Sequence, residues 1–172
     1  MINKLFNFYS NQKTWGLLIG SNIDNLKKIK QPFWSGRADP FIYNFEDKFF
    51  IIFEEINILT RKGKICVAEF YKNKLLKKKT ILKEQIHLSF PFIFNYKNTY
   101  LIPESHERKT VELYKLDMRN KNLTFVRNIL TNVECVDSVM CFYDKKYWLI
   151  TTEKSFNGNF NNLHVYYSND II

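Results

Sequence analysis

The sequence is poor in residues that mark several common classes of protein. Its 172 residues include only 5 glycines, 4 prolines and 3 cysteines, against a hydrophobic content of 45%, which excludes a disordered chain. The cysteines Cys66, Cys135 and Cys141 are odd in number and never form a CxxC pair. This argues against a disulfide framework or a zinc site and indicates a reducing compartment. We therefore expect no metal site and no cofactor.

Long apolar runs are also missing. No segment approaches the ~20 consecutive apolar residues of a membrane helix, so we expect no transmembrane segment. Residues 1–10 lack the apolar core of a signal peptide, and a cytoplasmic location is the expectation. No stretch has the spacing of a nucleic-acid-binding motif, so no nucleic-acid partner is expected.

Carboxylates are outnumbered, with 17 Asp and Glu against 26 Lys and Arg, a net charge of +9. One interpretation is an anionic partner such as nucleic acid, a phosphorylated glycan or an acidic membrane surface. The other, which we favour, is a lysine bias spread over solvated turns. The clearest lysine run, residues 74–83, lies between two strand patterns, where lysines protect an exposed edge strand from pairing with another chain.

Aromatic residues are abundant, with 16 Phe and 10 Tyr in short runs that favour strands. Residues 38–55 have the pattern of a β-hairpin, in which two apolar strands flank a polar turn. Asp39 opens this hairpin, and Glu54 and Glu55 close it. Because an antiparallel hairpin returns to the edge from which it starts, we expect these three acids to lie together.

The hairpin pattern occurs three times, beginning at Asp39, Phe90 and Asp137. Each copy is followed by a third strand, and the first two copies by a fourth. A spacing of about 50 residues with four strands per unit is typical of β-propeller blades. We predict a single all-β, propeller-like domain over residues 1–172. Its units are a half blade at 13–30, blades at 38–83 and 87–130, and a partial blade at 136–172.

The predicted number of blades is small. Propellers have about 4 to 8 blades, and this chain supplies about three to three and a half. The sequence therefore predicts an incomplete propeller, truncated at its C-terminus, or a homo-oligomer if the chain is complete.

Four short motifs occur in a characteristic order: residues 38–41, 53–55, 87–92 and 102–105. In order and spacing they resemble the N-terminal propeller-like domain of glucosamine inositolphosphorylceramide transferase and its bacterial relatives. That family is similar to the five-bladed superfamily of family 43 glycosidases, levansucrases and invertases. The resemblance implies a bacterial protein of surface-glycan or glycolipid biosynthesis, a sugar or sugar-nucleotide ligand, and a transferase partner domain.

Inner strands of a propeller start at one face, so acids of adjacent blades are expected to meet there. The candidate catalytic residues are Asp39, Glu104 and Asp137, because glycosidic hydrolysis uses one carboxylic acid and one carboxylate. By the resemblance, Asp39 matches the general base of family 43 enzymes. Glu104 is the best candidate for the acid, and Asp137 would tune the pKa of Glu104 through the proximity of like charges. Glu153 is expected near the same face. The candidate substrate-binding residues are Trp34, Arg37, Glu54, Glu55, His87, Ser89 and Ser105.

Aromatic side chains offer a second means of holding a sugar. Trp34, Tyr43, Tyr100, Tyr147 and Trp148 have rings on which a sugar can stack, although most should pack between blades. Trp34, in the loop before Asp39, is the one expected to reach the pocket.

Structural roles and three classes of function remain open. Asp39 precedes a proline and could cap a turn, and His87 could be structural. Glu54 and Glu104 could instead pair with arginines, namely Arg37, Arg61 or Arg108. The favoured function is a carbohydrate-binding module for a transferase. The alternatives are a glycoside hydrolase-like or glycosyl-transferring enzyme using Asp39 and Glu104, and a binder of anionic polymers driven by net charge.

Overall fold

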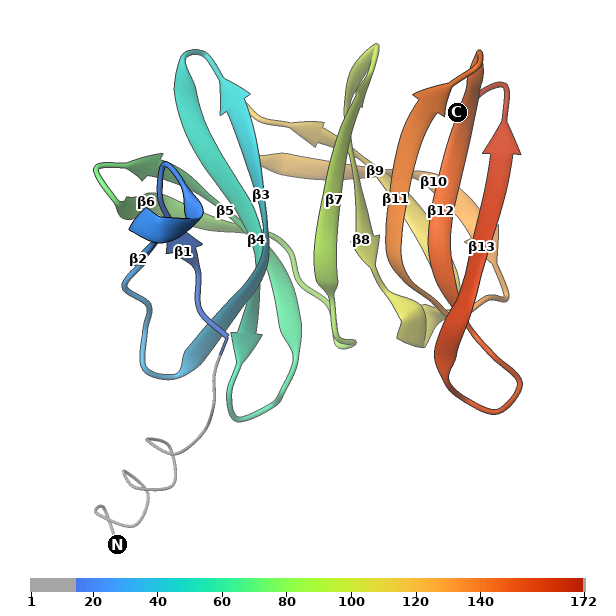
Figure 1. Cartoon of the computed structure of the whole chain (residues 1–172), viewed down its shortest axis with the longest axis horizontal. Helices are drawn as coiled ribbons and strands as arrows, with labels where there is room; N and C mark the ends of the chain where they lie inside the picture. Colours follow the sequence, from blue (N-terminus) through green and yellow to red (C-terminus); the bar gives the residue numbers. More distant parts are fainter. Residues whose placement is uncertain (1–14, 172) are drawn as a thin grey trace, which may run out of the picture.

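The structure is a computed structural model that describes residues 15–171, and antiparallel sheets form nearly all of it (Figure 1). At the N-terminus, β1 (Leu18–Ile19) pairs with β2 (Lys27–Lys28) across the short 3-10 turn η1 (Ile23–Asn25). This hairpin lies in the predicted half blade, whose residues 13 and 14 fall outside the described residues.

Three larger sheets follow in chain order. The first contains β3 (Ser35–Phe45), β4 (Lys48–Asn57), β5 (Gly63–Tyr71) and β6 (Lys74–Leu82). The second contains β7 (Ser89–Tyr96), β8 (Asn98–Glu104), β9 (Thr110–Asp117) and β10 (Asn122–Thr131), with the 3-10 turn η2 (His106–Arg108) before β9. The third contains β11 (Cys135–Tyr143), β12 (Lys146–Lys154) and β13 (Phe160–Ser168). In each sheet the strands pair in sequence order.

The strand β3 begins earlier than the sequence pattern suggests. The loop that was expected around Trp34, before Asp39, is partly strand, because Ser35 pairs with Asn57 and Arg37 pairs with Glu55 of β4. Pairing with β4 thus extends the strand back to Ser35, although the polar residues there suggested a loop.

Tight turns join the first two strands of each sheet. Glu46 and Asp47 have φ of 49° and 58°, and Asp144 and Lys145 have φ of 47° and 59°. Two consecutive positive φ values are characteristic of type I′ hairpin turns, which match the twist of the flanking strands. In the second sheet a single residue, Lys97, makes the turn with φ of 53°.

The core lies between neighbouring sheets in three layers. Leu17 and Ile29 of the N-terminal hairpin pack on the outer face of the first sheet. A second cluster joins the first and second sheets, and a third joins the second and third sheets. Each sheet thus buries its apolar side chains against its neighbours, as the blades of a propeller do.

The third sheet has one apolar face that no described residue covers. Val67 pairs with Ile52 in the first sheet and is 0% exposed against the second sheet. The equivalent pair in the third sheet is Val165 and Ile150, and Val165 is 53% exposed. Nothing in the described part of the chain lies where the next blade would pack.

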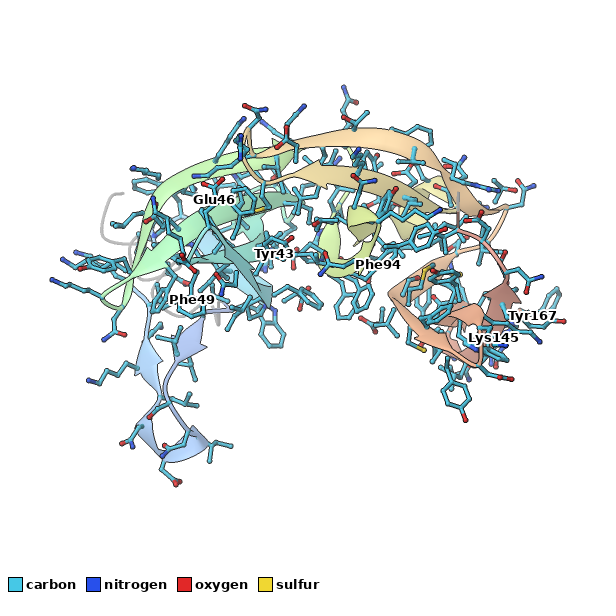
Figure 2. The ribbon with its side chains drawn as sticks, turned by 90° about the horizontal axis from the view of Figure 1, so that it is seen from above. Tyr43, Glu46, Phe49, Phe94, Lys145 and Tyr167 are labelled. Atoms are coloured by element: carbon cyan, nitrogen blue, oxygen red, sulfur yellow. The ribbon has the colours of Figure 1, made fainter. Side chains whose placement is uncertain are left out.

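The three sheets form an arc rather than a closed ring (Figure 2). The inner strands β3, β7 and β11 follow one another in contact on the concave side, where Tyr43 and Phe94 are labelled. The outer strands β6 and β10 lie on the convex side. The predicted all-β, incomplete propeller of four-stranded antiparallel blades is confirmed.

Candidate functional site

Each inner strand contains a bulge at the equivalent place. The register shifts between Ala38 and Phe41 in β3, and shifts in the same way early in β7 and β11. One residue of each bulge has a positive φ: Asp39 at 48°, Phe90 at 40° and Asp137 at 53°. A bulge bends its strand and re-aims the side chains. The structure thus repeats one local geometry at the residues that open the three sequence repeats.

A carboxylate of one sheet caps the bulge of the next. Asp39 Oδ2 accepts a hydrogen bond from the Phe90 N–H at 3.2 Å. Glu104 Oε2 accepts a hydrogen bond from the Asp137 N–H at 3.4 Å. Both junctions between consecutive sheets therefore place an acid beside the bulge of the following inner strand.

Glu54 joins this group from β4. Its side chain is buried, and His87 Nε2 lies 3.1 Å from its Oε1 atom. The distance is that of an ion pair, although the imidazole N–H does not point along the line that a hydrogen bond needs. The contact joins the first sheet to the segment that leads into β7.

The other nitrogen of His87 has two neighbours. The Gly63 N–H donates to Nδ1 at 3.1 Å, and the Arg61 carbonyl oxygen lies 3.2 Å from the same atom. The first contact needs an unprotonated Nδ1 and the second a protonated one. A side chain at position 63 would overlap both Glu54 Oε1 and the Leu88 carbonyl oxygen, so only glycine fits there.

Glu104 contacts a second histidine, His106. Its Oε1 atom lies 3.2 Å from His106 Nδ1, and the His106 ring meets the edge of Phe160. His106 was not among the expected site residues. It begins the 3-10 turn η2 after β8, where strand alternation gives no signal for its contact with Glu104.

Burial and the repulsion between carboxylates change the pKa values of these side chains. The pKa of Glu54 is raised by burial, which outweighs the opposing effect of His87, and the charge of Asp39 acts in the same direction as burial. The pKa of Asp137 is raised by burial and by the charge of Asp39. The pKa of His87 is raised, chiefly by Glu54.

We call Asp39, Glu54, Glu104 and Asp137, with His87 and His106, the inner acidic cluster. Three consecutive sheets contribute to it. Its carboxylates can accept hydrogen bonds from hydroxyl groups, and Glu54 and Asp137, whose pKa values are raised, keep a proton to a higher pH than ordinary carboxyl groups do.

Two of the predicted site residues lie on the other face of the first sheet. Glu55 follows Glu54 in β4 and therefore points the opposite way. Its carboxylate contacts Lys78 at 2.6 Å, Lys64 at 3.2 Å and Arg37 at 3.7 Å. Burial acts to raise the pKa of Glu55, but the bonds from Lys78 and Lys64 lower it overall. The expectation that Asp39, Glu54 and Glu55 gather at one place is therefore wrong for Glu55, and Arg37 lies with it.

The expected arginine partners are not the observed ones. Arg108 binds Glu112 at 2.8 Å and Glu84 at 3.2 Å. Glu54 and Glu104 have histidine contacts instead, at His87 and His106.

Two other candidates, Glu153 and Ser105, make their contacts outside the cluster, whereas Ser89 lies opposite a cluster residue. Glu153 contacts His164 and Tyr166, each at 3.3 Å. Ser105 is buried and donates to the Thr110 carbonyl oxygen at 3.3 Å. Ser89 is also buried and pairs with Glu104 across the ladder of β7 and β8.

The stacking candidates are mostly core residues. Tyr100 is buried and stacks on Phe94, and Tyr147 packs against Tyr96. Tyr43 donates or accepts a 2.6 Å hydrogen bond with Thr99. Trp148 packs on Tyr167 in the third sheet.

Trp34 is exposed, but the structure does not bring it to the cluster. It precedes β3, and Asp39 lies five residue steps further along the extended chain, about 16 Å at ~3.3 Å each. The aromatic ring beside the bulges is Phe41, whose centroid lies 5.4 Å from Phe90 and 5.8 Å from Phe92. These rings supply an apolar surface next to the carboxylates.

Metal-ligand groups and membrane-spanning helices were sought in residues 15–171. Within this range, no three or more His, Cys, Asp or Glu side chains are grouped as metal ligands. No helix in the same range is long and apolar enough to span a bilayer.

Comparisons with known proteins agree with the fold. The chain resembles an exo-1,5-alpha-L-arabinanase from a bovine ruminal metagenomic library, with a TM-score of 0.52 and 12% identity. The match covers 87% of this chain and 63% of the arabinanase. At this identity the likeness supports the propeller fold alone.

Sequence relatives are plant proteins named glucosamine inositolphosphorylceramide transferase 1. The rice protein (Oryza sativa subsp. japonica) is 32% identical over 137 residues, which are 77% of this chain and 18% of the relative. The Arabidopsis thaliana protein is 34% identical over 137 residues, which are 76% of this chain and 18% of the relative. The chain thus spans about a fifth of these relatives, and the bacterial source that we expected gains no support from them.

A family match covers most of the chain. Residues 28–172 match the family described as glucosamine inositolphosphorylceramide transferase 1, N-terminal. The chain belongs to this N-terminal domain family.

Proposed function

We propose that this domain binds a sugar or sugar-nucleotide at the inner acidic cluster and serves as a module for a transferase in glycolipid or surface-glycan biosynthesis. The observation that carries the proposal is the convergence of Asp39, Glu54, Glu104 and Asp137 from three consecutive sheets. Family membership supplies the biosynthetic setting, since the relatives are named as glycolipid transferases.

The chemistry of the cluster suits a polyhydroxylated ligand. Carboxylates accept hydrogen bonds from sugar hydroxyls, and bonds to a charged acceptor are stronger than neutral ones. Phe41 and Phe90 offer ring surface beside these acceptors, on which the C–H face of a sugar can pack. A ligand here would contact two sheet junctions at once.

A glycan array and a panel of sugar nucleotides test the proposal, with the purified chain as the probe. We expect binding that is lost when Asp39 and Asp137 are both changed to Asn. The matched control changes Asp47 and Asp144 to Asn. These turn residues also have positive φ, at 58° and 47°, so the two variants have equal net charge and similar backbone demands. Absence of binding to every compound, or equal loss in both variants, would contradict the proposal.

The raised pKa of Asp137 beside Asp39 favours one second candidate, a glycoside hydrolase-like activity. In such a reaction an acid of raised pKa protonates the leaving oxygen while a second carboxylate activates water. Asp39 would be that carboxylate. Turnover of an aryl glycoside by the unmodified chain, abolished by Asp39→Asn, is the expected result for this candidate, and absence of turnover removes it.

A further inference from the structure

The positive charge of the protein is concentrated on the convex side of the arc. From Tyr71 to Lys83, the segment that contains β6 has no Asp or Glu. From Met118 to Val133, the segment that contains β10 has none either. The cations of the two segments are Lys72, Lys74, Lys77, Lys78, Lys79, Lys83, Arg119, Lys121 and Arg127.

These two strands form one continuous surface, which we call the basic wall. The two outer strands are in contact, and Lys79 Nζ donates to the Asn120 carbonyl oxygen at 2.9 Å across the junction. They follow the convex side in Figure 2, opposite the concave side of the inner strands. The charge of the molecule is therefore asymmetric. The basic wall lies along the outer strands β6 and β10, and the inner acidic cluster lies beside the bulges of the inner strands.

Most of these cations form no ion pair with a carboxylate of the described residues. Lys78 binds the buried Glu55, and Arg119 binds Glu46. Lys74, Lys77 and Lys83 are exposed, and no ion pair with a carboxylate is found for them in the described structure. Edge protection alone, the role expected from the sequence, does not account for the second basic strand or for its contact with the first.

Apolar side chains are interleaved with the cations. Tyr71 is 55% exposed, Phe125 51% and Leu76 37%. Aromatic and aliphatic side chains among lysines are typical of proteins that rest in the headgroup region of a membrane.

We propose that the basic wall docks this domain onto the surface of a bilayer that contains anionic phospholipid. Lysines outnumber arginines in the wall, and lysine acts as a point charge that suits a diffuse negative surface. Nucleic-acid recognition favours arginine and, for single strands, a groove with stacking platforms, whereas this surface is convex. Docking by the wall leaves the concave side, with the inner strands, turned away from the bilayer.

Flotation of the purified chain with vesicles tests the proposal. The vesicles are phosphatidylcholine alone or phosphatidylcholine with phosphatidylserine. We expect binding to the anionic vesicles only, weakened by added salt because surface charge is screened. A variant with Lys74, Lys77 and Lys83 changed to Gln should bind roughly 100-fold more weakly, from about a fivefold loss per lysine.

The matched control changes Lys97, Lys145 and Lys146 to Gln, which removes the same charge from the inner hairpins of the second and third sheets, away from the wall. It should bind as the unmodified chain does, and thermal unfolding should show both variants folded. No binding to anionic vesicles, equal loss in the two variants, or retention of single-stranded RNA by the wall without vesicle binding would each overturn the proposal.

Discussion

Asp39 and Phe90 lie in consecutive sheets, and the Asp39 carboxylate accepts the Phe90 N–H at 3.2 Å. Both residues have positive φ and occupy the same place in their strands. The acid that the sequence marks as a candidate for chemistry therefore also stabilises the start of the next inner strand, and its two roles can be separated by substitution.

Asp39→Ala should lower the free energy of unfolding by about 1–2 kcal/mol, since it removes a hydrogen-bond acceptor and places alanine at positive φ. Asp39→Asn keeps an acceptor oxygen and a residue that tolerates this conformation, so we expect a change within about 0.5 kcal/mol. Urea unfolding of both variants measures the difference. Equal stability of the two would mean that the contact with Phe90 contributes nothing.

Gly63→Ala should be strongly destabilising, because its methyl group would overlap Glu54 Oε1 and the Leu88 carbonyl oxygen. Overpacking of this kind costs roughly 1–3 kcal/mol. Gly36 is the control, since a Cβ there would have its nearest neighbour at 3.5 Å, an ordinary contact. Thermal unfolding of Gly63→Ala and Gly36→Ala should give clearly different midpoints, and similar midpoints would contradict the described packing.

The uncovered face of the third sheet should tolerate charge. Val165→Lys should change the free energy of unfolding by no more than about 0.5 kcal/mol, because position 165 is exposed. Val67→Lys places the same side chain in the closed layer between the first two sheets and should prevent stable folding. Circular dichroism and solubility of the two variants provide the test. A severe effect at Val165 would show that this face is covered in solution.

Stability should fall as the pH rises. The pKa of His87 is raised by Glu54, so the stabilisation from this contact is complete below the unfolded value of about 6.5 and is lost as the pH passes the folded value. Burial raises the pKa of Glu54, so ionisation of this side chain also destabilises the folded state as the pH rises above about 4.5, the unfolded value.

We expect a lower free energy of unfolding at about pH 9 than at about pH 6, as measured in urea, and a smaller difference for His87→Gln. Gln85→Ala, which alters an exposed residue without a titratable group, should leave the difference unchanged. An unaltered pH dependence in His87→Gln would refute the role of this pair.

The repeat and the strands were predictable from the sequence, because aromatic and aliphatic alternation is a local property of each strand. The period also located Asp39, Phe90 and Asp137 as equivalent positions. What the sequence did not reveal is which atoms these residues meet. The hydrogen bond from the Phe90 N–H to the Asp39 carboxylate depends on the packing of two sheets, and no local pattern encodes that distance.

The wrong prediction for Glu55 has a different cause. Strand alternation alone places Glu54 and Glu55 on opposite faces, and the three cations around Glu55 confirm it. The ends of a hairpin are near one another in the chain trace, but their side chains divide between two layers.

The most direct test of the central proposal is to map the sugar site by the backbone amide resonances of the chain, titrated with the sugar or sugar-nucleotide that the array identifies. We expect the amides of Phe90 and Asp137 to shift most, because their carboxylate caps, Asp39 and Glu104, are the groups that the ligand would engage. Shifts confined to the outer strands β6 and β10, with the two bulge amides unmoved, would contradict it.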